Sequence, residues 1–351
     1  MTRHSRLIYR YSTLPLVLSL LLPASRSTGA SAVDSHQISF QSAGYRLVGT
    51  LTSPTGRPAV AGVLIIPGSG PADRDGLSTA APAMPPVYRQ WAQRLGEGGF
   101  SVLRYDKRFL THPSVDFSSL DQEAQIVDLL SATAFLRTVR ELASKPIFII
   151  GHSEGGTLAP IVAKRAGAIS GVIVVNAVQF AVDELLVAQL QANSAVPATT
   201  VAEVKRLFVT LTNNSFPKGG LLLGAGAGYW TQYVANSRDS PATLSRLPMP
   251  VLLVQSLSDE TLPGETLTRN LVLLRSVVAA NENAQLCELP AHDHLGMLPG
   301  EREPSPTFTK TLLQWLTNAG RAAQPGAAAD RPLSSTLARN ICAEAAKSSA
   351  F

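Results

Sequence analysis

The chain has 351 residues, of which 45% are hydrophobic and 16% charged. This length suffices for one large hydrophobic core and allows one or two domains. The formal net charge is +5. Residues 1–32 contribute four arginines and no acid to it, so the remaining residues carry a net charge of only +1. With no basic stripe interleaved with aromatic residues, nucleic-acid binding is not expected.

The first 32 residues have the features of a secretory signal peptide. Three arginines precede the apolar stretch Leu14–Leu22, and small residues follow at Ala30-Ser31-Ala32. The apolar stretch is shorter than the roughly 20 residues of a spanning helix. We therefore expect residues 1–32 to be cleaved on export, giving a secreted or periplasmic protein that no longer contacts the membrane. An uncleaved anchor is the alternative.

Strands and helices are then predicted in alternation. Apolar and polar residues alternate on both sides of Ala43-Gly44, which indicates an antiparallel hairpin formed by residues 36–42 and 45–54. Residues 121–139 are expected to form a surface helix with one apolar face, made of Ile126, Val127, Leu130, Ala134 and Leu136. In this half of the chain we further expect strands at 60–70, 101–108, 146–153 and 169–178, and helices at 87–100 and 155–167.

The alternation is interrupted at about residues 180–246, which contain helix-like segments but no convincing strand. Beyond them we expect strands at 250–263 and 284–295, and helices at 265–281 and 307–320. The pattern predicts an α/β fold, with a mostly parallel twisted sheet and helices on both faces. Residues 33–320 would form this domain, with 180–246 inserted as a helical cap, and the Ala-, Pro- and Ser-rich residues 321–351 would form a C-terminal tail.

No cofactor or metal is expected. The glycine-rich segment around Gly224, Gly226 and Gly228 lacks the G-x-G-x-x-G spacing and lies outside any strand–helix–strand unit, so dinucleotide binding is not predicted there. His292 and His294 have no third metal ligand nearby in the sequence.

The most informative segment is "PIFIIGHSEGG", residues 146–156, in which Ser153 stands between a buried strand and a helix. G-x-S-x-G in this context is the nucleophile elbow, a tight turn that presents the serine hydroxyl at the carboxyl end of the sheet. Glycines at 151 and 155 would remove clashing Cβ atoms, and Gly156 would let the helix start close to the strand. Ser153 is therefore predicted to be a catalytic nucleophile.

A serine nucleophile needs a histidine base and an acid that orients it. After a nucleophile elbow, the acid comes next along the chain and the histidine comes last. Asp259 ends one predicted strand and is the expected acid, with Asp183 and Glu184 as rival positions. The next strand ends in "LPAHDHL", which offers both His292 and His294 as the base. His152 should point away from the serine and be packed, and Glu260 is expected to be a solvated loop charge.

The oxyanion that develops during such a reaction needs two N–H donors. One is expected from Glu154, directly after the nucleophile, and the other from the loop after the third strand. In that loop, Gly68-Ser69-Gly70 lets the backbone approach a carbonyl, and the N–H of Ser69 is the predicted donor. A plain glycine turn is the alternative.

Two further motifs make the chain resemble the α/β-hydrolase superfamily, and more narrowly bacterial serine esterases. These are "PGSGPADRDG" at residues 67–76 and "RYDKRF" at 104–109, and the resemblance covers about residues 38–318. In that family the catalytic histidine is followed by a bulky apolar residue, which favours His294 over His292. Phe109 stands where the family has glycine, so substrate preference cannot be transferred. Arg74, Asp75, Asp106 and Lys107 are expected to form a structural charge network.

The sequence thus predicts a serine carboxylesterase acting on a small-molecule ester through Ser153, His294 and Asp259. A serine peptidase, an acyltransferase and an inactive binding module on the same fold are the alternatives. Export would also permit a disulfide between Cys287 and Cys342. The alternative is that Cys287 is an ordinary buried thiol. The oligomeric state is left open.

Overall fold

The computed structural model describes residues 32–323, except for 79–81, 113 and 117–118. Apart from Ala32, the predicted signal peptide lies outside the described residues, as do residues 324–351 of the predicted tail. Cleavage of the N-terminal segment and a disulfide to Cys342 therefore stay predictions, whereas Cys287 is fully buried. Among the described residues, no helix is both long and apolar enough to cross a membrane.

The centre of the fold is a sheet of eight strands in the order β1-β2-β4-β3-β5-β6-β7-β8. The hairpin at one edge and its contact with β4 are antiparallel, and the remaining pairs are parallel. The predicted α/β architecture is confirmed. The strands are β1 (Val33–Ser42), β2 (Tyr45–Pro54), β3 (Ala61–Ile66), β4 (Phe100–Tyr105), β5 (Ile147–His152), β6 (Gly171–Val175), β7 (Val251–Ser256) and β8 (Ala284–Leu289).

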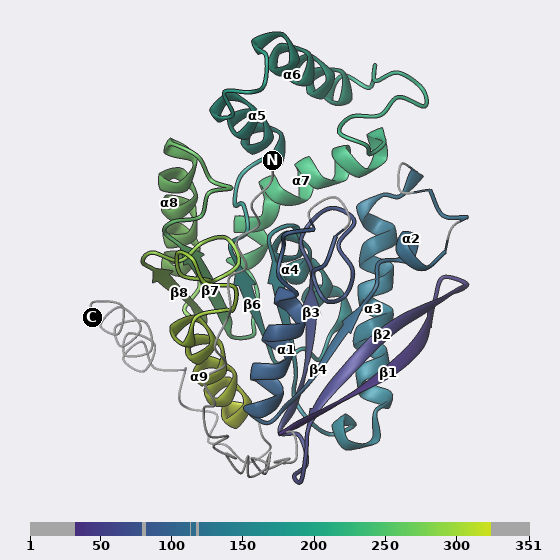
Figure 1. Ribbon diagram of the computed structural model, residues 1–351, viewed down its shortest axis with the longest axis vertical. Coiled ribbons are helices and arrows are strands. Elements are labelled where there is room, and N and C mark those ends of the chain that lie inside the picture. The colour runs from purple at the N-terminus through teal and green to yellow at the C-terminus, as the bar shows by residue number, and fades with distance from the viewer. Residues whose placement is uncertain (1–31, 79–81, 113, 117–118, 324–351) are drawn as a thin grey trace, which may run out of the picture. The chain divides into compact units, whose positions relative to one another are not determined.

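Helices follow most strands, and Figure 1 shows their arrangement about the sheet. They are α1 (Val87–Glu97), α2 (Arg108–Thr111), α3 (Gln122–Thr138), the 3₁₀ helix η2 (Arg140–Leu142), α4 (Glu154–Ala166), α5 (Val182–Ala192), α6 (Ala198–Thr212), α7 (Ala227–Leu244), α8 (Glu265–Ala280) and α9 (Pro306–Ala322).

Each face of the sheet packs against its own set of helices. Along β5, Ile147 and Ile149 face one hydrophobic cluster with α3, α4 and α8, whereas Phe148 and Ile150 face another with α1 and α9. This alternation arises because successive side chains of a strand point to opposite faces. Strands buried on both sides therefore read as continuous apolar runs, as β3 and β5 do.

The prediction for the face of α3 is wrong in part. Ala134 is exposed, and Val127 and Leu130 are only half-buried. The buried side includes Asp128, which forms an ion pair with Arg108 at 2.5 Å, and is made of Gln122, Ile126, Asp128, Leu129, Ala132, Thr133 and Leu136. A pattern of apolar residues could not reveal a buried face that contains a charged side chain with its partner on another element.

Residues 180–246 contain three helices, α5, α6 and α7, which share a separate apolar cluster that includes Phe208, Tyr229 and Trp230. In Figure 1, α5 and α6 lie above the strands at the top of the view. Gly224 has a φ of 82° and lies in a short turn closed by a bridge between Leu222 and Ala225, just before α7. Gly226 directly precedes α7 and Gly228 lies in its first turn, so among the described residues no strand leads into this glycine segment.

Candidate active site

Ser153 occupies the sharp turn between β5 and α4. Its φ of 54° and ψ of −123° lie outside the regions that side-chain-bearing residues ordinarily adopt, and such conformations cost about 1–3 kcal/mol. A Cβ on Gly151 would lie 2.2 Å from the Gly155 carbonyl oxygen, and one on Gly155 would lie 2.3 Å from the Ile66 oxygen. Only glycine at both positions permits this turn, which leaves the Ser153 side chain half-exposed on a cavity wall.

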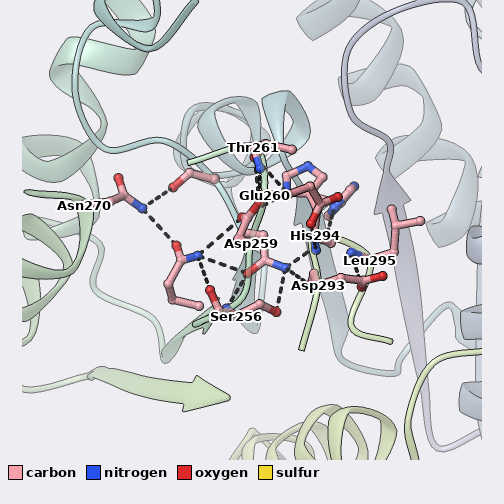
Figure 2. A network of polar contacts seen from close by, with 12 residues as sticks. Ser256, Asp259, Glu260, Thr261, Asn270, Asp293, His294 and Leu295 are labelled. Atoms are coloured by element: carbon pink, nitrogen blue, oxygen red, sulfur yellow. Dashed lines mark hydrogen bonds and ion pairs between the residues drawn. The ribbon is translucent and has the colours of Figure 1, made fainter. Parts of the chain in front are cut away.

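Asp259 and His294 lie side by side at the carboxyl ends of β7 and β8 (Figure 2). Nδ1 of His294 is 3.0 Å from each carboxylate oxygen of Asp259, whose side chain is completely buried. Burial by itself would raise the pKa of the Asp259 carboxyl, but hydrogen bonding and the charge of His294, together with hydrogen bonds from Thr261, lower it below its ordinary value. Because an ionised carboxylate only accepts hydrogen bonds, the proton of the imidazole lies on Nδ1, and Nε2 is the nitrogen that can accept another proton.

Thr261 completes this pair, although it was not among the predicted site residues. Its backbone N–H and its hydroxyl both donate to Oδ1 of Asp259, at 3.0 and 2.7 Å. The hydroxyl is also 3.2 Å from Nδ1 of His294. These contacts fix the carboxylate against the imidazole. A hydroxyl residue two positions after a candidate acid was the available signal.

The rival acids are placed differently. Asp183 and Glu184 lie in the first turn of α5, where Glu184 forms an ion pair with Arg269. Glu260 is exposed, as expected for a solvated charge, yet one of its carboxylate oxygens accepts from the backbone N–H of His294 at 3.3 Å. Of these carboxylates, Asp259 is the one in contact with the His294 ring.

His292, the rival base, is completely buried, and hydrogen bonds engage both of its ring nitrogens. Nδ1 donates to the carbonyl of Pro290 and Nε2 accepts from the hydroxyl of Ser305, both at 2.6 Å. Ser305 in turn caps α9 by accepting from the N–H of Phe308. This arrangement anchors α9 and leaves no ring nitrogen available to a substrate.

His152 is buried and hydrogen-bonded, in line with the prediction. Its Nδ1 lies 2.8 Å from the hydroxyl of Tyr88, and its Nε2 lies 2.9 Å from the carbonyl oxygen of His294. The Tyr88 hydroxyl also accepts from the N–H of Gly68 at 2.8 Å, so it donates to Nδ1, and Nε2–H donates to His294. Burial, assisted by the charge of His294, lowers the pKa of His152 to about 3, so the ring is neutral.

Ser69 lies in the loop after β3 and lines the same cavity as Ser153 and His294. Glu154 is the first residue of α4, where backbone N–H groups have no partner within the helix. Its carboxylate is buried and accepts from Nε2 of Gln122 at 2.7 Å and from the hydroxyl of Tyr229 at 2.9 Å. It thereby connects α4 to α3 and α7, contacts that its neighbours in the sequence could not reveal.

The expected charge network is present beside the loop after β3, which carries Ser69, but it is split into separate contacts. Arg74 pairs with Asp106 at 3.3 Å, whereas Asp75 pairs with the buried Arg104, which was not among the predicted members of the network. Lys107 donates instead to two backbone carbonyls of the loop.

Ser69, Ser153 and His294 line a common cavity of about 200 Å³. Its walls come from the ends of the strands and from α5 and α7, and are formed by Ser69, Ser153, Asn176, Val178, Val182, Leu185, Leu186, Gln189, Tyr229, Trp230, Tyr233, Thr261, Leu262 and His294. Apart from His294 and the tyrosine hydroxyls, the lining has no titratable group. Within the described part of the chain, no three His, Cys, Asp or Glu side chains gather as a metal site would require.

Comparison with known proteins assigns the chain to a family. Residues 63–306 match the alpha/beta hydrolase family. The chain is 28% identical over 262 residues to esterase EstD of Thermotoga maritima, an alignment covering 74% of this chain and 60% of that protein. The chain therefore spans less than two thirds of the length of this curated relative.

Two solved structures share the fold at low sequence identity. An esterase of Pyrococcus furiosus aligns with a TM-score of 0.54 and 14% identity over 82% of this chain and 91% of its own. A proline iminopeptidase of Mycobacterium smegmatis aligns with a TM-score of 0.53 and 14% identity over 82% of this chain and 100% of its own. Since both kinds of enzyme share the fold, it does not by itself identify the reaction. The family match spans most of the sequence, and the chain belongs to the alpha/beta hydrolase family.

Proposed function

We propose that this protein is a serine carboxylesterase that hydrolyses small uncharged esters. The observation that carries the proposal is the cavity shared by Ser153 and His294, with Asp259 bonded to the far side of the imidazole. The similarity to a Thermotoga maritima protein named as an esterase supports the same reaction class. A lining without lysine, arginine or carboxylate side chains suits an uncharged substrate.

In the proposed reaction, Oγ of Ser153 attacks the ester carbonyl carbon while its proton passes to Nε2 of His294. The electron pair of the carbonyl double bond moves to oxygen, and the N–H groups of Ser69 and Glu154 stabilise this oxyanion. Asp259 keeps the imidazole in the required tautomer and stabilises its cationic form. Collapse of the intermediate breaks the ester C–O bond, and the leaving alcohol takes the proton from His294.

The resulting acyl-enzyme is hydrolysed by the same steps in reverse. Water replaces the alcohol, gives a proton to His294 and attacks the acyl carbon. Collapse releases the carboxylic acid and returns the proton to Ser153. These steps need only the side chains and backbone groups named here, with no cofactor.

The decisive experiment compares the wild type with Ser153→Ala. The wild type should hydrolyse p-nitrophenyl acetate or butyrate and react covalently with a fluorophosphonate probe. The variant should fold normally, lose the labelling and retain at most about a millionth of kcat, since removal of a nucleophile is typically this damaging. A variant with more than about a tenth of wild-type activity would refute the role of Ser153, and an unlabelled, inactive wild type would favour a binding module.

We also propose that α5, α6 and α7 act as a cap that shapes the substrate cavity. Two of these helices supply apolar and aromatic side chains to its wall, among them Leu186 and Trp230. Export of the protein, with cleavage after residue 32, likewise stays a proposal. It rests on the arginines and the apolar stretch of the N-terminal segment and is tested by N-terminal sequencing of protein recovered from the periplasm or medium.

A further inference from the structure

Lys107 is a buried cation whose hydrogen bonds go to the loop that carries Ser69. It follows β4, and only 9% of its surface is exposed. Its Nζ donates to the carbonyl oxygen of Gly68 at 2.6 Å and to that of Gly70 at 3.1 Å. A buried ammonium is costly unless it is hydrogen-bonded, so a site that retains one for two backbone carbonyls calls for a reason beyond packing.

The geometry of the peptide bond supplies that reason. The carbonyl oxygen of Gly68 and the N–H of Ser69 belong to the same planar peptide unit, and in a trans peptide these two groups point in opposite directions. Holding the Gly68 oxygen toward Lys107 therefore directs the Ser69 N–H away from the lysine. Ser69 lines the cavity that Ser153 and His294 also line.

Gly68 itself is fixed against the nucleophile. A Cβ at Gly68 would lie 3.1 Å from Cβ of Ser153, so the glycine backbone packs directly beside this side chain. Its N–H donates to the hydroxyl of Tyr88 at 2.8 Å, which fixes the preceding peptide plane as well. Lys107 and Tyr88 thus hold the two peptide units on either side of Gly68 from two different elements.

We propose that Lys107 is a positioning residue that aims the Ser69 N–H at the oxyanion that forms on the substrate when Ser153 attacks its carbonyl carbon. The proposal rests on the serine-esterase function proposed above. The cation also polarises the peptide unit, since a hydrogen bond from a charged donor to the carbonyl strengthens the N–H at its other end as a donor. Burial lowers the pKa of Lys107, and the charge of Glu154 opposes this shift.

A purely structural lysine and a positioning lysine predict different kinetics. Loss of a structural contact would lower stability and would affect bound substrate and transition state alike. A misdirected oxyanion donor affects only species with negative charge on the carbonyl oxygen, so kcat falls while KM changes little. A trifluoromethyl ketone reports the same difference, because the serine oxygen adds to its carbonyl carbon and leaves an oxyanion in the same place.

The experiment compares Lys107→Met, Lys107→Arg and the matched control Arg108→Met. Methionine removes the donors at similar length, and arginine keeps the charge but changes the donor geometry. Arg108 is the next residue and equally buried, but its partner is Asp128 rather than the loop. Each variant is measured for thermal stability, kcat and KM on a p-nitrophenyl ester, and inhibition by the trifluoromethyl ketone.

For Lys107→Met we expect kcat to fall roughly 10- to 100-fold with KM within about threefold, and ketone affinity to fall by a similar factor, given that deleting one such donor costs about 100- to 1,000-fold. Lys107→Arg should show a smaller loss in the same direction, and it decides the question alone if the methionine variant does not fold. Arg108→Met should lose stability without weakening the ketone selectively.

The proposal is overturned if the folded Lys107 variants keep kcat and ketone affinity within about twofold of the wild type, or if substrate and ketone binding weaken equally. Either result leaves the esterase function standing as long as the wild type hydrolyses esters and reacts with the fluorophosphonate. A wild type that does neither removes the proposed function itself.

Discussion

Nε2–H of His152 donates to the backbone carbonyl of His294 at 2.9 Å, which joins the neighbour of Ser153 to the loop that carries the candidate base. On its other side, His152 accepts from the hydroxyl of Tyr88, which accepts from the N–H of Gly68. One chain of hydrogen bonds therefore connects the loop of Ser69 with the loop of His294. The separation of the proposed oxyanion donor from the proposed base depends on it.

Removing the middle of this chain should reduce turnover. Tyr88→Phe leaves the Gly68 N–H and Nδ1 of His152 without their partner, and we expect the free energy of unfolding to fall by about 2–4 kcal/mol. We expect kcat to fall roughly tenfold or more with little change in KM, because small displacements of catalytic groups greatly lower the rate of the chemical step. Denaturant unfolding and steady-state kinetics measure both effects. Tyr105→Phe, which removes a buried hydroxyl from β4, is the control and should keep kcat; an equal loss there would contradict the specific role of Tyr88.

The neutral state of His152 predicts a pH dependence of stability. Its pKa is about 3 in the folded protein and roughly 6.5 in the unfolded chain. Between these values the unfolded chain binds one more proton, so the free energy of unfolding decreases as the pH falls from about 6.5, by about 1.4 kcal/mol per pH unit. Above about pH 6.5 the contribution of His152 is fully present. Urea unfolding from about pH 5 to 7 measures this slope, and in His152→Gln the slope should lose the contribution of one proton. If the variant and the wild type have the same slope, His152 is protonated in the folded protein.

The two histidines of "AHDHL" should fail in different ways. His294→Ala should abolish turnover to about the level of Ser153→Ala while keeping most of the stability, because its side chain lines the cavity. His292→Ala removes the side chain that joins Pro290 to Ser305, so it should lower the unfolding free energy by about 2–4 kcal/mol. At a temperature where it stays folded, it should retain substantial activity. The opposite ranking in activity would reassign the base.

The size of the cavity predicts a preference among acyl chains. At about 200 Å³ it is smaller than the roughly 300–1,000 Å³ of pockets for drug-sized ligands, so short acyl groups should be preferred. Leu186→Ala should enlarge the cavity. Burial of each additional methylene of the acyl chain contributes about 0.8 kcal/mol, which raises kcat/KM roughly fourfold. A p-nitrophenyl ester series measures the optimum. Leu190→Ala, on the same helix but outside the cavity lining, is the control. An optimum that shifts in neither variant, or equally in both, would speak against the cap proposal.

The sequence by itself determined the fold and the position of the nucleophile candidate, because both are written in local patterns. Continuous apolar runs identified strands buried on both faces, and the glycines around Ser153 identified a turn that no Cβ could fit. Parallel strands end at one edge of the sheet, so Asp259 and the two histidines were expected at the same edge as Ser153. The sequence could not tell from spacing alone which of the histidines would face the acid.

Tertiary structure decided what depends on contacts between distant segments. The environment of Gly68 includes Tyr88 and Lys107, and the partners of Glu154 come from α3 and α7. The buried pair Arg108 and Asp128 likewise altered the face of α3 that the apolar pattern had predicted. Hydrophobic periodicity reports only whether a residue faces the core. Which polar group meets it there is fixed by the packing of whole elements, since a buried donor or acceptor must find a partner wherever the fold brings one within hydrogen-bonding distance.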